Sequence, residues 1–272
     1  HTLYDRCRNM LYCSTNNIQG YSSMKRTLHA LVMLLLFLST LQATYIITDK
    51  TKLEEIRANN VVLQDPVLHI LGAIEKPDSY ILKIEARSPR GSQLITAFLD
   101  KKTSELYIGS GYDKKGRAIL FPKDAQTIKE GVAFSYGTGN KDIYVITDPE
   151  CPYCTRFEKA VHGKLSAYTV HVIFFPLAFH KKAPAMVDWI MQGEDDAEKK
   201  ERFEKIMLKG STEYSSLIKD VKKPYVYSEA VKPAMKKMER AVLELNVRGT
   251  PAIYDVNFNP VSQDQLFGGI KK

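Results

Sequence analysis

The segment from Ile143 to Phe157 constrains the fold of this chain more than any other. A β-favouring apolar run ends at Asp148-Pro149, and the sequence Cys151-Pro-Tyr-Cys154 follows at the start of a segment with helical periodicity. The sequence therefore predicts a strand, a turn, and a pair of cysteines at the N-terminus of a helix.

At that position the two thiols take different roles. Cys151 falls at the predicted N-cap, where unpaired backbone N–H groups and the positive end of the helix dipole favour a thiolate, and we expect this thiolate to be accessible. Pro152 suits the first helical position because it has no N–H to leave unpaired there. Cys154 lies about one turn further on, within reach of a mixed disulfide at Cys151. We interpret the pair as a nucleophile and a resolving thiol.

Two other interpretations of this cysteine spacing are weaker. Tetrahedral zinc needs four ligands, normally including a second cysteine pair, and no such pair follows downstream. A purely structural disulfide would close a loop too short to add much stability. Redox chemistry is therefore favoured, with no metal site and no bound cofactor.

Residues 24–43 have the pattern of a secretory signal. A positive start, Met24-Lys-Arg26, precedes an apolar run from Ala30 to Leu41. The run is short for a transmembrane span, which needs about 20 apolar residues, although an uncleaved anchor is the alternative. Both interpretations imply export. We interpret residues 1–23 as a non-native or misassigned upstream segment.

Excluding residues 1–23 leaves a single cysteine pair in the exported chain, because Cys7 and Cys13 lie in that segment. A disulfide scaffold normally has several bridges in a small domain, so one pair in an oxidising compartment is more typical of catalysis. The net charge of +8 is only weak evidence for nucleic-acid binding. Lysine and arginine alternate with carboxylates, as in residues 236–240, which favours solvated helix faces over nucleic-acid binding.

The chain has 272 residues, of which 44% are hydrophobic, enough for two modest domains. Residues 44–121 predict a small α+β domain with a helix at 51–57, where Thr51 and Glu54 have capping-box spacing. An antiparallel meander is expected to follow, with strands at 80–87, 93–99, 105–108 and 118–121. Such a sheet has unpaired edges, and pairing them in a homodimer is one physical solution.

Residues 122–140 predict a helical linker, and residues 141–272 predict the second domain. A strand at 142–147, a helix whose apolar stripe runs from Cys154 to Leu165, and a strand at 168–175 indicate a βαβ unit with the dithiol at the strand-to-helix switch. Further helices are expected at 185–191, 201–208 and 235–245. Trp189 is expected in the core.

Near the C-terminus, Gly249-Thr-Pro251 ends a helical stretch and precedes a β-favouring run. A cis bond before Pro251 would make a tight turn and leave neighbouring backbone groups free to pair with an extended peptide. An ordinary trans turn is the alternative.

Asp148-Pro-Glu-Cys-Pro-Tyr-Cys154 followed by Gly249-Thr-Pro251 resembles the thioredoxin-fold catalytic domain of periplasmic thiol:disulfide interchange proteins of the DsbC/DsbG type. The order of parts is also similar over residues 24–267. The resemblance implies a thioredoxin-like catalytic domain, a cystatin-like N-terminal dimerisation domain and a helical linker. It implies Cys151 as nucleophile and Cys154 as resolving thiol, with Thr250 and cis Pro251 holding the substrate.

The resemblance further implies a periplasmic homodimer that acts on exported proteins and is kept reduced by a membrane thiol reductase. Pro152 and Tyr153, between the two cysteines, are also predicted to contact substrate. Three features depart from the family. Val145 replaces a buried carboxylate found in many thioredoxin-like enzymes, Glu150 should oppose a thiolate at Cys151, and only residues 268–272 follow Phe267 where a terminal helix is expected.

The sequence favours a disulfide isomerase or reductase over two alternatives. One is a chaperone or binding module whose dithiol is secondary, and the other is a dithiol oxidase. Oxidation, reduction and isomerisation use the same two sulfur atoms, so the direction of electron flow depends on the reduction potential and on partner access.

Overall fold

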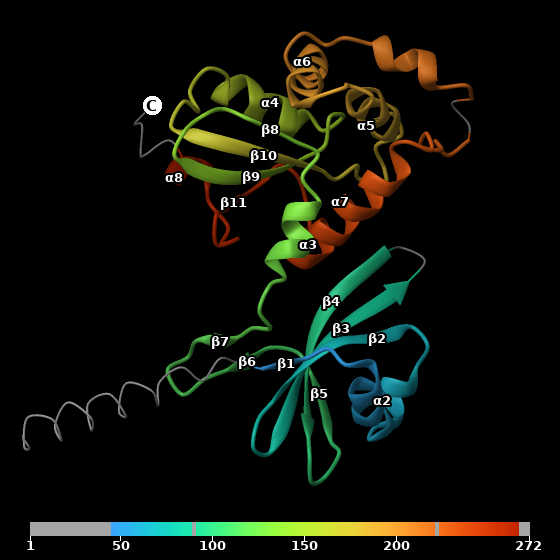
Figure 1. Cartoon of the computed structure of the whole chain (residues 1–272), viewed down its shortest axis with the longest axis vertical. Coiled ribbons are helices and arrows are strands. Elements are labelled where there is room, and N and C mark those ends of the chain that lie inside the picture. The colour runs from blue at the N-terminus through green and yellow to red at the C-terminus, as the bar shows by residue number, and fades with distance from the viewer. Residues whose placement is uncertain (1–44, 89–90, 221–222, 267–272) are drawn as a thin grey trace, which may run out of the picture. The chain divides into compact units, whose positions relative to one another are not determined.

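The computed structural model describes residues 45–88, 91–220 and 223–266 (Figure 1). The predicted signal at 24–43, the upstream segment 1–23 and residues 268–272 lie outside the described residues. The described residues build two hydrophobic clusters, one from residues between Ile47 and Leu106 and one from residues between Ile128 and Leu266. In the described part of the chain, no helix is both long and apolar enough to span a bilayer.

The N-terminal cluster lies between a helix and an antiparallel sheet. Helix α2 (Lys50–Ala58) and the 3-10 turn η1 (Val61–Gln64) precede strands β2 (Leu68–Glu75), β3 (Ser79–Ser88), β4 (Gly91–Asp100) and β5 (Leu106–Ile108). The short strand β1 (Ile46–Ile47) completes a sheet of order β1-β2-β3-β4-β5. The predicted α+β architecture is observed here.

Three local predictions for this region are wrong. Helix α2 is capped by Asp49, whose carboxylate accepts from the backbone N–H of Lys52 at 2.9 Å, and not by Thr51. The strand predicted at 118–121 is β7 (Ala118–Ile119), which pairs with β6 (Gly111–Tyr112) in a separate hairpin. Strand β2 has no predicted counterpart, because its apolar residues run almost continuously and a bulge between Ile70 and Gly72 breaks any alternation.

The C-terminal sheet has the order β11-β9-β10-β8. Its strands are β8 (Phe134–Tyr136), β9 (Lys141–Thr147), β10 (Tyr168–Phe174) and β11 (Ala252–Asp255). Strands β9 and β10 are parallel and are joined through helix α4 (Pro152–Val161), which confirms the predicted βαβ unit. Strand β8 falls within the residues predicted as linker and pairs with β10, while β11 pairs antiparallel with β9.

Helices cover both faces of this sheet, with α4 and α6 on one side and α7 with α3 on the other (Figure 1). Their bounds are α3 (Ala125–Glu130), α5 (Ala183–Met191), α6 (Asp196–Met207), η2 (Glu213–Leu217), α7 (Lys232–Leu245) and α8 (Gln263–Leu266). Helix α4 ends at Val161, so Leu165 packs on the core from the following turn and not from the predicted helical stripe. Trp189 is half-buried against the core.

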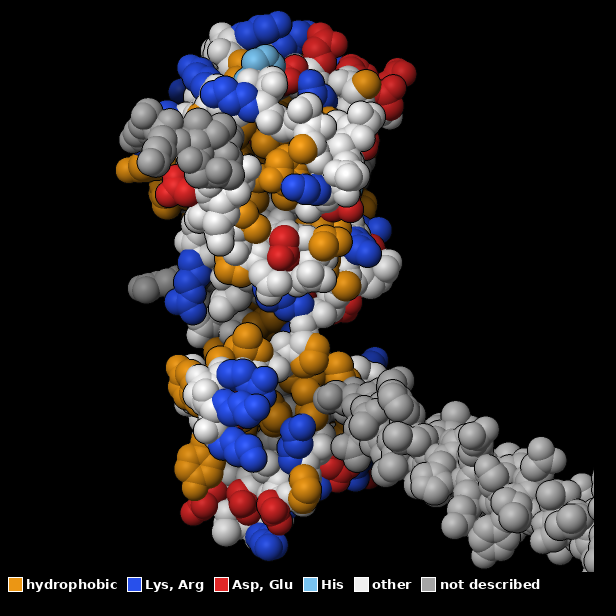
Figure 2. Space-filling view, turned by 90° about the vertical axis from the view of Figure 1, so that its left-hand side faces the viewer, with side chains coloured by type: hydrophobic (Ala, Val, Ile, Leu, Met, Phe, Trp, Pro, Cys, Tyr) orange, Lys and Arg blue, Asp and Glu red, His pale blue; other side chains and the backbone are white. Residues whose placement is uncertain are grey.

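The surface carries charges of both signs. In the lower part of the face shown in Figure 2, several lysine and arginine side chains lie next to one another above a row of acidic side chains, and hydrophobic side chains lie around both groups. Several large apolar side chains are exposed on or beside the short strands β5 to β7, namely Tyr107, Ile108, Tyr112 and Leu120. These side chains leave apolar area in contact with water in the N-terminal region.

Candidate dithiol site

Both cysteines of the Cys-Pro-Tyr-Cys sequence lie where strand β9 gives way to helix α4. The strand ends at Thr147, Cys151 is the N-cap residue of α4, and Pro152 occupies its first turn, as the sequence predicts. Both thiols are free. The two sulfur-bearing residues therefore share one helix start, with Cys151 at the cap and Cys154 in the first turn.

The thiol of Cys151 is far less accessible than predicted. The residue is only 4% exposed. Its sulfur lies 3.7 Å from the backbone carbonyl oxygen of Thr250, to which the thiol can donate. The loop before β11 covers the helix start, a contact between residues 99 positions apart that no local sequence pattern predicts.

The covering loop contains the Thr250–Pro251 peptide bond, which is cis. Strand β11 begins directly after it, and the pairing of Ala252 with Ile146 places this loop beside the end of β9. The topology thus brings Thr250 to the dithiol, although the two motifs are far apart in sequence.

Cys154 is completely buried, and burial is the main reason why its pKa is raised to about 12. The hydroxyl groups of Thr250 and Thr147 and the backbone N–H of Asp148 act in the opposite direction and lower it. The N–H of Asp148 lies 3.4 Å from the Cys154 sulfur. Cys154 therefore stays a neutral thiol at neutral pH unless its surroundings change.

The hydroxyl oxygens of Thr147 and Thr250 are buried and have no hydrogen-bond partner of regular geometry among the described residues. Both nevertheless lie close enough to the Cys154 thiol to lower its pKa. The hydroxyl groups therefore lie near the Cys154 sulfur, but without the alignment of a regular hydrogen bond. Donors placed next to a group that becomes negative during a reaction stabilise it at that moment.

Asp148 connects the dithiol turn to the segment after β10. Its side chain is fully buried and accepts from the backbone N–H groups of Glu150 at 2.8 Å and Leu177 at 2.7 Å. The Nδ1 atom of His180 lies 2.8 Å from the same carboxylate. The sequence motif contains Asp148 and Glu150, but the partners Leu177 and His180 lie about 30 residues away, so the motif alone does not predict this connection.

Glu150 makes a second connection to the same segment. Its carboxylate accepts from the backbone N–H groups of Lys182 at 2.6 Å and Ala183 at 2.8 Å, at the start of α5. A carboxylate at a helix N-terminus is stabilised by the helix dipole. The predicted opposition of Glu150 to a thiolate at Cys151 stays a prediction.

The surface beside the dithiol is partly apolar. Tyr153 is 63% exposed, and the guanidinium of Arg156 stacks on its ring at 4.5 Å. Pro152 is also exposed. Phe179, which follows Leu177 in the segment tied down by Asp148, is 71% exposed. The sequence did not single out Phe179, since a lone phenylalanine in a loop carries no pattern.

Val145, at the position where many thioredoxin-like enzymes have a carboxylate, is buried in the core. In the described part of the chain, no group of three or more His, Cys, Asp and Glu side chains is arranged to hold a metal ion. The chemistry that these residues can perform themselves is that of two thiols with unequal surroundings.

In a comparison with protein families, residues 135–259 match the family described as a thioredoxin-like domain. These residues form a thioredoxin-like domain. The match confirms the thioredoxin-like fold predicted for the C-terminal part, and it includes the dithiol, the cis-proline loop and most of strand β8. No curated protein matches the chain.

Solved structures give more distant likenesses. DsbG of Helicobacter pylori is 16% identical, with 74% of this chain and 99% of that chain covered and a TM-score of 0.35. ScsC of Proteus mirabilis in a transitional conformation is 17% identical, with coverage of 49% and 70% and a TM-score of 0.37. A putative protein-disulfide isomerase from Pseudomonas syringae is 15% identical, with coverage of 49% and 91% and a TM-score of 0.34. With TM-scores below 0.5, the fold assignment rests on the domain match and the strand order.

Proposed function

We propose that this protein catalyses thiol–disulfide interchange in exported proteins through Cys151 and Cys154. The observation that carries the proposal is the contact between the Cys151 sulfur and the carbonyl of Thr250, which joins a helix-start dithiol to a cis-proline loop. A thioredoxin-like domain around both elements supports it. Export rests on the signal pattern at residues 24–43.

The first step is attack of the Cys151 thiolate on a substrate disulfide. The substrate S–S bond breaks, a mixed disulfide forms at Cys151, and the second substrate sulfur leaves as a thiolate that takes up a proton. Because the Cys151 sulfur is covered by Thr250, a substrate must replace this contact, and the Thr250 carbonyl then becomes available to a substrate backbone N–H.

The second step has two outcomes. A thiol of the substrate attacks the mixed disulfide, which isomerises the substrate with no net change in oxidation state. Alternatively, Cys154 attacks Cys151, so that the substrate leaves reduced and the Cys151–Cys154 disulfide forms. Burial holds Cys154 as a thiol, which favours a long-lived mixed disulfide and therefore isomerisation. A membrane thiol reductase is the proposed donor of two electrons that returns the dithiol to its reduced form.

Substrate contacts are proposed for the exposed side chains around the dithiol. Pro152 and Tyr153 lie on the surface, and Thr250 and Pro251 form the covering loop. Phe179 adds an apolar side chain on the neighbouring segment. This combination suits an unfolded polypeptide, because apolar surface holds side chains while the loop carbonyl accepts from the backbone.

Single cysteine variants test the catalytic proposal. Cys151→Ser should abolish both insulin reduction and refolding of scrambled ribonuclease, because no nucleophile remains. Cys154→Ser should abolish turnover in insulin reduction but keep part of the isomerisation and accumulate mixed disulfides on gels. Full activity of Cys151→Ser in both assays would reject the proposal.

Equilibration of the dithiol with glutathione shows the direction of electron flow. A mostly reduced pair indicates an isomerase or reductase, and a mostly oxidised pair indicates an oxidase.

Homodimerisation through the N-terminal region is also proposed. Strand β5 is an edge of the described sheet, and its Tyr107 and Ile108 are exposed together with Tyr112 and Leu120 nearby. A monomer mass by light scattering at micromolar concentration would contradict it.

The same apolar surface favours the alternative of a chaperone or binding module. That alternative holds if suppression of aggregation survives loss of both cysteines while exported substrates still refold normally in the cell.

A further inference from the structure

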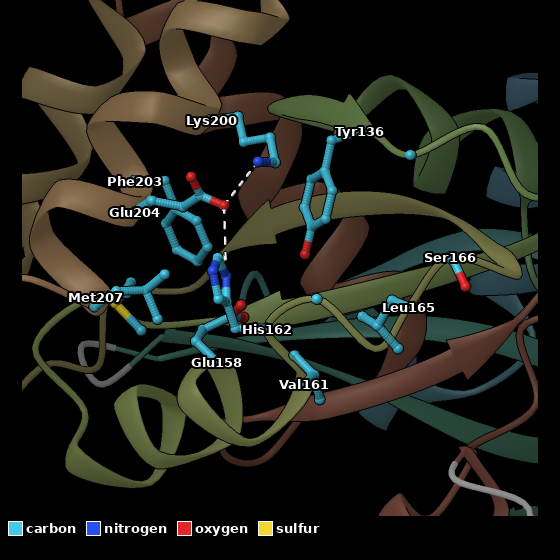
Figure 3. Close-up of a pocket in the computed structure, with 13 residues that line it drawn as sticks. Tyr136, Glu158, Val161, His162, Leu165, Ser166, Lys200, Phe203, Glu204 and Met207 are labelled. Atoms are coloured by element: carbon cyan, nitrogen blue, oxygen red, sulfur yellow. Dashed lines mark hydrogen bonds and ion pairs between the residues drawn. The ribbon is translucent and has the colours of Figure 1, made fainter.

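A concave site lies in the C-terminal domain, away from the residues of the dithiol. It is a cavity of about 320 Å³ between the end of α4, the turn after it, strand β8 and helix α6 (Figure 3). None of its lining residues belongs to the dithiol or to the cis-proline loop. Its volume is at the lower end of the range of small-molecule sites.

Glu158 is the unusual residue of this cavity. It lies on α4, one turn after Cys154, and is only 7% exposed. Among the described residues, no N–H or O–H group donates to its carboxyl group. A buried carboxylate without donors is costly, and burial together with the neighbouring charge of Glu204 raises the pKa of Glu158 to about 8.

The other charges of the cavity are already paired. Glu204 accepts from Lys200 at 2.7 Å, and the Nδ1 atom of His162 lies 3.8 Å from the same carboxylate (Figure 3). Lys200 also lies over the ring of Tyr136, at 5.4 Å. Lys200, the lysine that lines the cavity, is therefore held by Glu204 and Tyr136.

Tyr136 and the apolar walls complete the cavity. Burial first, and then the charges of Glu158 and Glu204, raise the pKa of Tyr136, so that it remains a phenol. Its hydroxyl group has no partner among the described residues and points into the space between β8 and α4 (Figure 3). The apolar part of the lining consists of Val161, Leu165, Phe203 and Met207.

We propose that this cavity binds a small organic cation, an ammonium or amidinium group carried on a short apolar or aromatic body. The cation would donate to an ionised Glu158 and would offset the repulsion that Glu204 exerts on that charge. An anion would meet these two carboxylates, and a neutral hydrocarbon would leave Glu158 unpaired. The body would pack against Phe203 and Leu165, and the ammonium would also be attracted by the Tyr136 ring.

Benzylamine is the probe, and benzyl alcohol is the matched neutral control. In wild-type protein, benzylamine should shift the amide signals of residues 136, 158–166 and 203–208 in a saturable way, whereas benzyl alcohol should not. Glu158→Gln should weaken the affinity at least about 10-fold, because one charged hydrogen bond is lost. Glu201 is an exposed acidic residue on α6 that does not line the cavity, so Glu201→Gln should leave the affinity for benzylamine unchanged.

Proton release gives a second readout, and its total is measured in wild-type protein, so it does not depend on how well Glu158→Gln folds. At pH 7, Glu158 should be largely protonated, so binding of an ammonium should release up to one proton. Titration calorimetry in two buffers of different ionisation enthalpy measures this number in wild-type protein. The groups that face Glu158 are Tyr136, His162, Lys200 and Glu204, and Glu158→Gln shows which part of the release belongs to Glu158.

The proposal fails if benzylamine shifts only signals outside the cavity, or if Glu158→Gln binds it as tightly as wild type. A capped lysine amide distinguishes the sources of the cation: binding at least as tight as that of benzylamine indicates a side chain of a partner protein, and absence of such binding indicates a free amine. Cys151→Ser should bind benzylamine normally, so failure of the proposed disulfide chemistry and failure of this site are separable.

Discussion

Two buried carboxyl groups near the two ends of helix α4 differ in their hydrogen bonding. Before its start, the Asp148 carboxylate is fully buried and accepts from two backbone N–H groups, with the His180 ring also at hydrogen-bond distance. Near its end, the Glu158 carboxyl group is almost as buried, has no donor among the described residues and faces a cavity. Both groups lie in one domain, within about ten residues of each other.

Because of this difference, we assign a structural role to Asp148 and propose a binding role for Glu158. The partners of Asp148 come from the chain itself, so its carboxylate holds the dithiol turn against the segment that begins with Leu177. Glu158 is instead buried beside the like charge of Glu204, and no N–H or O–H group of the described residues donates to it, which is why we propose that it binds a ligand. Substitutions at the two ends should therefore change stability in opposite directions.

The largest loss of stability is expected for Asp148→Ala. Removing the carboxylate leaves buried N–H groups at residues 150 and 177 and the His180 ring without an acceptor, at about 1–3 kcal/mol for each group. The free energy of unfolding should fall by about 3 kcal/mol or more in urea denaturation. Asp148→Asn keeps one carbonyl oxygen and should lose about half as much. A loss below about 1 kcal/mol for Asp148→Ala would show that the turn does not depend on this carboxylate.

Glu158→Gln should act in the opposite direction, with an effect that grows with pH. In the native state Glu158 keeps its proton up to about pH 8, whereas the unfolded chain releases it near pH 4.5. The native state therefore binds more protons in this window, and the free energy of unfolding should decrease with rising pH by up to about 1.4 kcal/mol per pH unit from this group.

In Glu158→Gln this contribution should vanish, so the variant should be more stable than wild type at pH 8 and closest to it near pH 5. Urea denaturation at pH 5, 6, 7 and 8 measures both curves, with Glu201→Gln as the control that should follow wild type. Parallel curves for wild type and Glu158→Gln would show that Glu158 ionises normally.

Thr147→Val tests whether the buried hydroxyls beside Cys154 assist its attack on the mixed disulfide. A hydrogen bond to a developing thiolate contributes about 1.5 kcal/mol, so its loss should slow Cys151–Cys154 disulfide formation about 10-fold. The pKa of Cys154 should rise further, which moves the pH profile of this step upward. Thr147→Ser keeps the hydroxyl and should retain most of the rate. Equal rates for the valine variant and wild type would leave Thr147 with a packing role only.

The smallest effect is expected for Glu150→Gln. The amide can still accept from the N–H groups of Lys182 and Ala183, but the favourable interaction between a negative charge and the α5 dipole is lost. Stability should fall by about 0.5–1 kcal/mol in urea denaturation. A gain in stability would instead indicate that the charge of Glu150 is unfavourable beside the dithiol.

Local sequence patterns determined much of this fold. Apolar alternation in β3, turn residues around β4 and the β-rich runs at β9 and β10 act over a few residues, and the structure places these four strands within one or two residues of the predicted bounds. Pro152 marks the start of α4 as predicted, but the helix ends four residues before Leu165. The predictions failed where the local signal was ambiguous. Strand β2 is almost uniformly apolar, and Thr51 competed with the neighbouring Asp49 as the helix cap.

Tertiary structure decided the environment of each functional side chain. The sequence by itself determined that two cysteines share a helix start and that a Thr-Pro turn occurs about 96 residues later. Only the pairing of β11 with β9 placed the Thr250 carbonyl over Cys151, and only the packing of α6 and β8 against α4 left Glu158 without donors. Burial and pKa depend on groups brought from distant parts of the chain, and these are quantities that a local motif does not contain.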